Sequence, residues 1–424
     1  MARALGIDFG TSNSAVAVRT ENGAEPVALE DGRSVMPSAI FVRPNGDVLF
    51  GRAAFAAYVE GDEGRFMRGL KSLLGSPLLH ERTFAGGRGR SFAEIVGLYL
   101  GELKRRADAA TGEATDAVVM GRPVRFVDRD DAADARAERE LEAIVRLQGF
   151  DHVAFEYEPV AAAFEHERRI AAPTLALVAD IGGGTSDFSL IRLRPDAEDD
   201  RTGDILASAG VHVGGTDYDR EISLAAAMPA LGRGTMLKGG RMATRDLPMP
   251  NHPFVDLATW HRIPFLYTRE ARAKQQELLD AARRPDLFGR YRDVVEDHRG
   301  HELAIAVEDA KIAAVERGEA RLDVCGHVEV PLAIATLAGT TDRLTQGVGE
   351  ALDAVLREAG VAARDVQTLI WMGGGSLFSP LREALRARLP ETSEVSDDLL
   401  GSVSRGLAIR ADRARGRTCG HSDG

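Results

Sequence analysis

The sequence of 424 residues is 44% hydrophobic and 28% charged, which is typical of a folded protein with two or three domains. Its formal net charge of −12 disfavours general attraction to nucleic acid or anionic lipid, and its two cysteines cannot form a disulfide framework. The sequence shows neither a secretory signal nor an apolar run of the roughly eighteen residues that a membrane-spanning helix needs. We therefore expect a cytoplasmic protein that has no nucleic-acid or membrane partner.

The first predicted elements are two short strands joined by a turn. Residues 5–8 and 14–18 are apolar runs, and the glycine and asparagine between them suit a turn. A helix is predicted at 91–107, where Ser91 and Glu94 form a capping box ahead of one apolar stripe. A strand at 117–120 and an amphipathic helix at 134–147 follow.

The opening pattern then recurs. Residues 175–180 predict a strand, 181–187 a glycine-rich turn, and 188–193 a second strand. In both copies the first strand ends near an aspartate, and the turn carries glycine, Thr-Ser and then Asn or Asp. The separation is far longer than one solenoid repeat, so we interpret the copies as two related lobes.

The character of the chain changes between about 235 and 300, where prolines cluster and a charged helical stretch covers 269–284. We expect an inserted subdomain there. Helices are predicted at 302–315 and 342–359, and a strand at 368–372 ends in a run of glycines. The last dozen residues are rich in arginine and glycine, which predicts a frayed tail.

The two matched turns suit phosphate and metal. Their glycines leave backbone N–H groups free to close on phosphate oxygens, and their hydroxyls add donors. The carboxylates of Asp8 and Asp180 cannot bind phosphate, but they can hold Mg²⁺ through its waters. The residues expected to contact phosphate are Gly10, Thr11, Ser12, Asn13, Gly182, Gly183, Gly184 and Thr185. The alternative is that each turn is only a tight hairpin.

Two common phosphate sites are excluded. The sequence has no Gly-Lys pair and therefore no Walker A loop, and no glycine run fits the dinucleotide-binding fingerprint. Only five of the 53 basic residues are lysines, so a lysine at a site is more informative here than usual.

Residues 6–14 (Gly-Ile-Asp-Phe-Gly-Thr-Ser-Asn-Ser) and 180–187 (Asp-Ile-Gly-Gly-Gly-Thr-Ser-Asp) resemble the two phosphate motifs of the actin, sugar-kinase and heat-shock ATPase superfamily. Further stretches are similar to motifs of the seventy-kilodalton heat-shock chaperones of the DnaK type, namely 71–75, 157–163, 213–219, 308–311 and 374–380. These motifs stand in the family's order over nearly the whole chain. Residues 247–251 and 398–403 resemble the divergent YegD-type branch.

The resemblance implies an α/β protein with a duplicated actin-like ATPase fold, in which two lobes surround a nucleotide cleft. The implied parts are lobe I at 1–172 with a subdomain at 31–109 and with 390–412 packing back, lobe II at 173–389 with an inserted subdomain at 220–305, and a disordered tail at 413–424.

The resemblance also assigns roles to single residues. Lys71 would contact the γ-phosphate and orient the attacking water, within a network that Glu158 shares with the waters of Mg²⁺. The implied catalytic set is Lys71, Glu158, Asp180, Asp8 and Thr185, with Asp8 and Asp180 holding the metal through waters. The implied contacts to the rest of the nucleotide are Gly214, Gly215, Glu308, Lys311, Gly374, Gly375, Ser376 and Phe378.

The adenine pocket departs from the family pattern. The two arginines that sandwich the base in the family are Ile312 and Phe378 here, and a serine is replaced by Val315, so the expected pocket is more apolar. Phe378 either stacks on the base or is a core residue under its loop, and both interpretations stay open.

The function implied is binding of ATP or ADP with Mg²⁺ and weak, slow ATP hydrolysis in a chaperone-like module that acts on a protein partner or client. Because the chain ends soon after the ATPase pattern, we expect no peptide-binding domain. Two alternatives stay open, a sugar or small-molecule kinase of the same superfamily and a non-catalytic, nucleotide-gated scaffold. A kinase needs a general-base carboxylate at its acceptor hydroxyl, whereas the Lys71 motif points to water.

Overall fold

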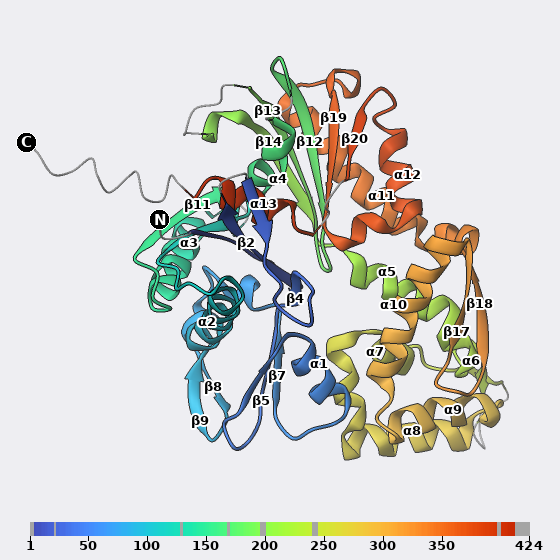
Figure 1. The fold of residues 1–424 in the computed structure, drawn as a ribbon. Helices are drawn as coiled ribbons and strands as arrows, with labels where there is room; N and C mark the ends of the chain where they lie inside the picture. The colour runs from blue at the N-terminus through green and yellow to red at the C-terminus, as the bar shows by residue number, and fades with distance from the viewer. Residues whose placement is uncertain are drawn as a thin grey trace, which may run out of the picture. The chain divides into compact units, whose positions relative to one another are not determined.

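The computed structural model describes residues 4–20, 23–127, 130–167, 170–195, 201–239, 245–396 and 400–411. The chain forms two compact units, which we describe separately (Figure 1). Unit 1 comprises Met1–His212, Ala351–Ser376 and Arg388–Gly424, and unit 2 comprises Val213–Glu350 and Leu377–Ala387. The expected lobes, 1–172 and 173–389, divide the chain at other points, and the lobe assignment stays a prediction.

Unit 1 contains two sheets that share one strand order. The strands of the first sheet are β1 (Ala4–Phe9), β2 (Asn13–Thr20), β3 (Gly23–Pro26), β4 (Val35–Pro37), β10 (Ala117–Arg122) and β11 (His152–Tyr157). Those of the second are β12 (Thr174–Ile181), β13 (Ser186–Leu193), β14 (Ile205–Val211), β19 (Thr368–Met372) and β20 (Ser393–Val395). The orders are β3-β2-β1-β10-β11, with β4 added on β2, and β14-β13-β12-β19-β20.

The pairing within the two sheets is also the same. Strand β1 lies antiparallel to β2 and parallel to β10, and strand β12 lies antiparallel to β13 and parallel to β19. The repeat seen in the sequence is therefore a repeat of the fold. The sequence prediction of a duplicated α/β core is confirmed.

Two helices join the sheets of unit 1 into one core. The main helices of this unit are α1 (Gly51–Val59), α2 (Phe92–Thr111), α3 (Asp131–Arg146), α4 (Glu158–Glu167) and α13 (Ser402–Ile409). Helix α4 contacts β10 and β11 of the first sheet and β12, β13 and β19 of the second, and α13 packs on α4 and β1. Buried side chains from both sheets and both helices, including Val119, Val178, Ala161 and Leu407, form a single apolar cluster.

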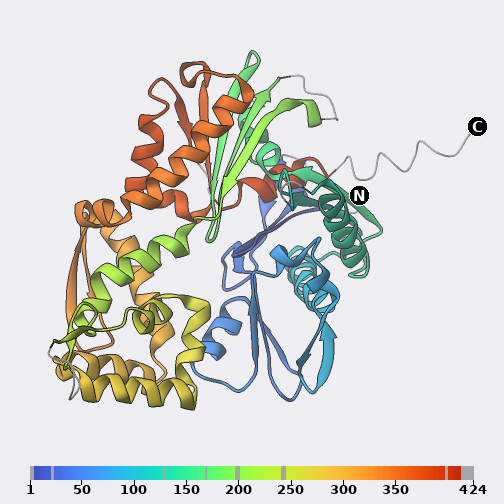
Figure 2. The same ribbon diagram turned by 180° about the vertical axis from the view of Figure 1, so that it is seen from behind.

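The remaining elements of unit 1 are small. A three-stranded sheet, a hairpin and several short 3₁₀ turns complete it, and α1 packs on β5 (Figure 2). These elements are β5 (Ala39–Val42), β6 (Val48–Phe50), β7 (Arg65–Arg68), η1 (Leu70–Leu73), η2 (Pro77–His80), β8 (Arg82–Ala85), β9 (Arg88–Ser91), η3 (Thr202–Asp204) and η6 (Ala363–Asp365), with most of η7 (Gly374–Leu377).

Helix α2 forms as its sequence predicts. The Ser91 hydroxyl accepts the N–H of Glu94, and the Glu94 carboxylate accepts the N–H of Ser91 at 2.6 Å, which completes the capping box. The stripe of Ile95, Tyr99 and Leu103 is buried in the core of the first sheet. The helix continues to Thr111, beyond the predicted end at residue 107, and stops at a glycine in the left-handed region.

Unit 2 is mainly helical. Its helices are α5 (Gly215–Ile222), the π-helical turn η4 (Ser223–Ala227), α6 (Met228–Ala230), α7 (His252–Ala258), the 3₁₀ segment η5 (Trp260–Tyr267), α8 (Arg269–Ala281), α9 (Pro285–Glu296), α10 (Gly300–Arg317), α12 (Ser379–Ala387) and the first part of α11 (Ile334–Ala359). Two short hairpins are formed by β15 (Met236–Leu237) with β16 (Leu247–Pro248) and by β17 (Glu319–Asp323) with β18 (Glu329–Ala333). The charged helix expected at 269–284 is α8.

Some sequence expectations lie outside the described residues. These include the tail at 413–424 and part of the 398–403 motif. Within the described part of the chain, no helix is long and apolar enough to cross a membrane.

Helix α13 approaches α4 so closely that only glycine fits at the contact. A methyl group at Gly406 would collide with the backbone carbonyl of Ala161. We expect Gly406→Ala to destabilise the protein by about 1–3 kcal/mol, the usual cost of overpacking. The matched control is Gly347→Ala in α11, where nothing lies within 4 Å and alanine should stabilise the helix by up to about 1 kcal/mol. Urea unfolding curves measure both, and a stabilised Gly406→Ala protein would contradict the packing.

Candidate functional site

The two matched turns close equivalent hairpins in unit 1. Asp8 lies in β1 just before the first turn, and Asp180 lies in β12 just before the second, where it pairs across the hairpin with Asp187. The second turn is closed by the N–H of Gly182, which donates to the carbonyl of Thr185 at 2.9 Å. In each of the two hairpins, the turn therefore follows an aspartate at the equivalent position. The turn residues are Gly10, Thr11 and Ser12 ahead of Asn13, and Gly182, Gly183, Gly184 and Thr185.

The structure brings these turns into contact with each other. A methyl group at Gly183 would collide with the Ser12 hydroxyl oxygen, so the second turn lies directly against the first. A side chain at position 183 would require the Ser12 hydroxyl to move. The sequence predicted the two turns separately, and their contact is a product of the tertiary fold.

A third glycine run packs on the second turn. Gly373 has φ of +73°, and a methyl group there would lie 2.7 Å from Asp180 Oδ1 and would also collide with the Ile181 carbonyl. The Ser376 hydroxyl is buried and donates to the carbonyl of Gly373 at 2.6 Å. Gly374 and Gly375 therefore come directly after a residue, Gly373, that contacts strand β12 at Asp180.

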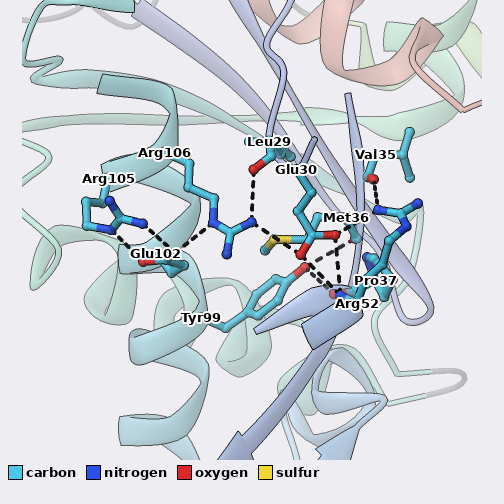
Figure 3. A network of polar contacts seen from close by, with 10 residues as sticks. All are labelled: Leu29, Glu30, Val35, Met36, Pro37, Arg52, Tyr99, Glu102, Arg105 and Arg106. Atoms are coloured by element: carbon cyan, nitrogen blue, oxygen red, sulfur yellow. Dashed lines mark hydrogen bonds and ion pairs between the residues drawn. The ribbon is translucent and has the colours of Figure 1, made fainter. Parts of the chain in front are cut away.

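A polar network holds the segment that contacts the first turn, and Figure 3 shows the part of it around Glu30 and Tyr99. The N–H of Ser38 donates to the carbonyl of Ser12 at 2.8 Å, and the Tyr99 hydroxyl donates to the carbonyl of Pro37 at 3.0 Å. Next to Pro37, the buried Glu30 carboxylate accepts from Arg52 at 2.7 Å and pairs with Arg106 at 3.2 Å. Helices α1 and α2 thereby anchor the segment that holds the first turn.

The predicted lysine and glutamate form a buried ion pair. Lys71 lies in η1 and Glu158 begins α4, and Lys71 Nζ is 2.6 Å from Glu158 Oε1. Their side chains are 11% and 12% exposed. These residues are far apart in the sequence, so the contact depends on how η1 and α4 pack.

Negative charge exceeds positive charge around this pair. Burial, and then the nearby Glu158 carboxylate, raise the pKa of Asp8 from 3.8 to about 7, against the opposing effect of Lys71. Burial, Glu158, Asp187 and Asp8 raise the pKa of Asp180 to about 8. Burial alone would lower the pKa of Lys71, but Glu158, Asp8 and Asp180 raise it, so Lys71 stays charged. One ammonium thus faces several carboxylates that resist ionising together.

This donor set fits a hydrated magnesium ion. A divalent cation would balance the surplus carboxylate charge, and Mg²⁺ prefers oxygen ligands and keeps several of its waters. Among the described residues, no group of three or more His, Cys, Asp or Glu could hold a metal ion directly. The binding of Mg²⁺ by Asp8 and Asp180 through its waters stays a prediction.

The other predicted nucleotide contacts lie in unit 2. Gly214 caps α5, where its N–H donates to Asp217 at 3.1 Å, and Gly215 is the first residue of that helix. Lys311 of α10 pairs with Asp219 of α5 at 2.7 Å, while Glu308 of α10 is exposed. The ion pair fixes α10 against α5.

Sequence reasoning missed Asp187 and Asp219 as members of these clusters. Both residues lie inside motifs named above, at 180–187 and 213–219. Their position beside predicted site residues was the signal in the sequence that could have identified them. Their charge effects come from cross-strand and helix–helix contacts that the motifs alone do not show.

Phe378 is buried within unit 2. It is 4% exposed, and its ring centroid lies 5.1 Å from that of Tyr218 at an interplanar angle of 55°. Ile312, by contrast, is 45% exposed on α10. The packing of Phe378 favours its interpretation as a core residue.

Comparisons with known proteins agree with the fold and the turns. Residues 4–85 match the family model described as "Hsp70 protein". The chain is 32% identical over 240 residues to "Chaperone protein HscA homolog" of Azotobacter vinelandii, an alignment that covers 52% of this chain and 37% of that protein. It is 27% identical to the HscA homolog of Bordetella petrii and 24% identical to "Chaperone protein DnaK" of Elusimicrobium minutum, each over 97% of this chain and 58% of the relative.

The duplicated sheets and their paired aspartate–glycine turns form the duplicated fold of the actin-like ATPases. The family model and the relatives make the chain similar to Hsp70-type chaperones, as its sequence motifs indicated. The chain spans 37% to 58% of the length of these relatives. The YegD-type branch stays a prediction.

The raised pKa of Asp8 predicts how stability depends on pH in metal-free protein. Asp8 has a pKa of about 7 in the folded state and about 4 when unfolded, so its contribution is fully present below about pH 4 and is lost as the pH rises through about 7. Asp8→Asn, which stays neutral, should therefore raise the melting temperature strongly at pH 9 and much less at pH 5. Thermal melts in EDTA at both pH values test this. An equal shift at both would contradict it, and Glu142→Gln, at an exposed pair with Arg146, is the control.

Phe378→Leu separates the two interpretations of that ring. Leucine keeps part of the packing against Tyr218 but cannot stack on a base. We expect a loss of stability and unchanged affinity for ATP and ADP by calorimetry. Weakening of about 1–3 kcal/mol, the range for stacking of a base on an aromatic ring, would instead show that Phe378 contacts adenine. Leu377→Ala, at the 54% exposed neighbour, controls for disturbance of the loop.

Proposed function

We propose that this chain binds ATP with Mg²⁺ and hydrolyses it slowly to ADP and phosphate, as the nucleotide-binding module of a chaperone-like protein. The observation that carries the proposal is the buried Lys71–Glu158 ion pair, which lies among the carboxylates of Asp8 and Asp180. Transfer of a phosphoryl group to water needs mainly positioning and charge stabilisation, and these residues supply both.

Lys71 is the residue proposed to act on the reacting phosphate. Its ammonium is a compact charge whose Nζ is held at 2.6 Å from Glu158 Oε1. Glu158 accepts a hydrogen bond from Lys71, and the other ammonium protons would be available to the γ-phosphate and the attacking water. A guanidinium would need more space and a planar partner, and the chain uses lysine here although arginine is far commoner in it.

The two turns are proposed to hold the phosphate chain. Backbone N–H groups of a glycine-rich turn bind phosphate oxygens, and the hydroxyls of Thr11 and Thr185 add donors. The contact of Ser12 with Gly183 supports a single binding surface made by both turns. Phosphate held there would lie beside the strands that carry Asp8 and Asp180.

Magnesium, when bound, neutralises charge on the phosphates and stabilises the charge that develops during transfer. Asp8 and Asp180 would hold its waters by accepting hydrogen bonds at their carboxylate oxygens. Burial first, and then the neighbouring carboxylates, raise the pKa values of both groups, and a bound cation would favour their ionised forms by balancing their charge.

The relatives are named as chaperones, and this supports a protein client or partner for the present chain. The identity of that partner, action without a peptide-binding domain, and a cytoplasmic location stay predictions. Unit 2, with the Lys311–Asp219 pair and the exposed Glu308, is proposed to contact the adenosine part of the nucleotide.

Phosphate release from ATP, followed with and without Mg²⁺ and beside a panel of sugars and polyols, tests the proposal. Magnesium-dependent release that the panel does not accelerate supports it. Transfer of phosphate to a panel member would identify a kinase, and tight nucleotide binding without release would identify a non-catalytic scaffold.

Lys71→Ala should slow hydrolysis by roughly 100- to 1000-fold, because removing one preorganised electrostatic contact costs about 3–4 kcal/mol in the transition state. Asp8→Asn and Asp180→Asn should also slow it strongly. The matched control is Lys104→Ala, since Lys104 also makes a 2.6 Å pair, with Asp108, and is 13% exposed. Wild-type hydrolysis by Lys71→Ala, or an equal loss in Lys104→Ala, would refute the role of Lys71.

A further inference from the structure

The loop that carries Lys71 is attached to helix α3 through the backbone of Gly75. The Gly75 N–H donates to Glu140 Oε2 at 2.9 Å, and the Gly75 carbonyl accepts from the Arg136 guanidinium. Arg136 and Glu140 are four residues apart in α3 and so share one face of the helix. One peptide segment, four residues after Lys71, is thus held on both sides.

This attachment leaves the loop little room to move. Gly75 has φ of +77°, a conformation that favours glycine, and a methyl group there would lie 2.8 Å from the carbonyl oxygen of Ala133 and 3.1 Å from the Ala137 side chain. Leu70 and Leu74, on either side of Lys71, are buried in the core of the first sheet. The loop therefore lies flush against α3 and the core.

Glu140 uses its second oxygen as well. Its Oε1 lies 2.9 Å from His80 Nε2 at the end of η2, and its side chain is only 12% exposed. The carboxylate therefore joins η2 and Gly75 to one point on α3. Such a shared contact fixes both ends of the 75–80 segment.

Helix α3 is itself fixed to the strands of the site. Arg122, at the end of β10, donates to Asp134 at 2.9 Å and also bonds to Glu138, both on α3. Strand β10 pairs with β1, which carries Asp8. Glu140 therefore connects the Lys71 loop to the same framework that holds the Asp8 carboxylate.

We propose that Glu140 is a positioning residue for Lys71, which sets the reach of its ammonium toward Glu158 and the phosphate. This inference rests on the proposed function. Glu140 acts through Gly75 and touches neither nucleotide nor water of the reaction. A misplacement of a catalytic group by about 1 Å can slow a reaction up to about 100-fold. A loosened loop should therefore lower the rate of hydrolysis and leave the affinity for nucleotide nearly unchanged.

The test compares four variants of the full chain, Glu140→Ala, Glu140→Gln, Glu142→Ala and the double variant Lys71→Ala/Glu140→Ala, with Lys71→Ala alone. Glutamine keeps an acceptor for the Gly75 N–H and so should rescue function. Glu142 lies on the same helix in an exposed pair with Arg146, which makes it the matched control. The readouts are hydrogen exchange of the amides at 70–76, single-turnover hydrolysis of bound ATP, and the affinity for ADP.

We expect Glu140→Ala to exchange the Gly75 amide faster and to hydrolyse ATP about tenfold more slowly, with unchanged ADP affinity. Glu140→Gln and Glu142→Ala should resemble the wild type. In the Lys71→Ala background, loss of Glu140 should slow hydrolysis no further, because its effect passes through Lys71.

Three results would overturn the inference. They are a wild-type rate for Glu140→Ala, an equal slowing of that variant with and without Lys71, and a loss in Glu142→Ala as large as in Glu140→Ala. If Lys71→Ala itself hydrolyses ATP normally, the proposed function fails and this inference falls with it. If Lys71→Ala is slow but Glu140→Ala is not, only the inference is wrong.

Discussion

The site depends on the ion pair between Lys71 and Glu158, because Lys71 supplies the positive charge that faces a buried group of carboxylates. Removing water from ions is costly, and breaking such a pair by deleting one partner typically costs about 3–5 kcal/mol. Lys71 stays charged because Glu158 raises its pKa against the effect of burial, as do the nearby carboxylates of Asp8 and Asp180. Those carboxylates in turn carry raised pKa values, and a cation bound beside them would balance their charge.

The duplicated sheets explain why the groups converge. Each sheet places an aspartate beside a glycine-rich hairpin turn, and α4 contacts both sheets while presenting Glu158 at its first residue. Two glycines are needed for this packing because they have no side chain. Gly183 lies in contact with Ser12, and Gly373 lies in contact with Asp180. The geometry that we propose for phosphate binding is thus a consequence of close backbone packing around a small number of charges.

Unit 2 contains the positions at which this chain departs from the Hsp70 pattern that it resembles. The Lys311–Asp219 pair is kept within two packed helices, and burial raises the pKa of Asp219 to about 6 against the attraction of Lys311. Phe378 packs on Tyr218, and Ile312 remains exposed. Two positions that the sequence placed at the adenine base are therefore apolar, one buried and one exposed, and their contact with the base stays a prediction.

The sequence by itself determined the features that depend on neighbouring residues. These are the two aspartate–glycine hairpins, the capping box of α2 and the repeat that predicts two like sheets, because turn chemistry and apolar periodicity act over a few residues. Only the tertiary structure decided which distant groups meet. The 2.6 Å pair of Lys71 with Glu158, the hold of Glu140 on Gly75 and the burial of Phe378 each join segments whose separation in the sequence carries no signal of contact, since packing of whole elements brings them together.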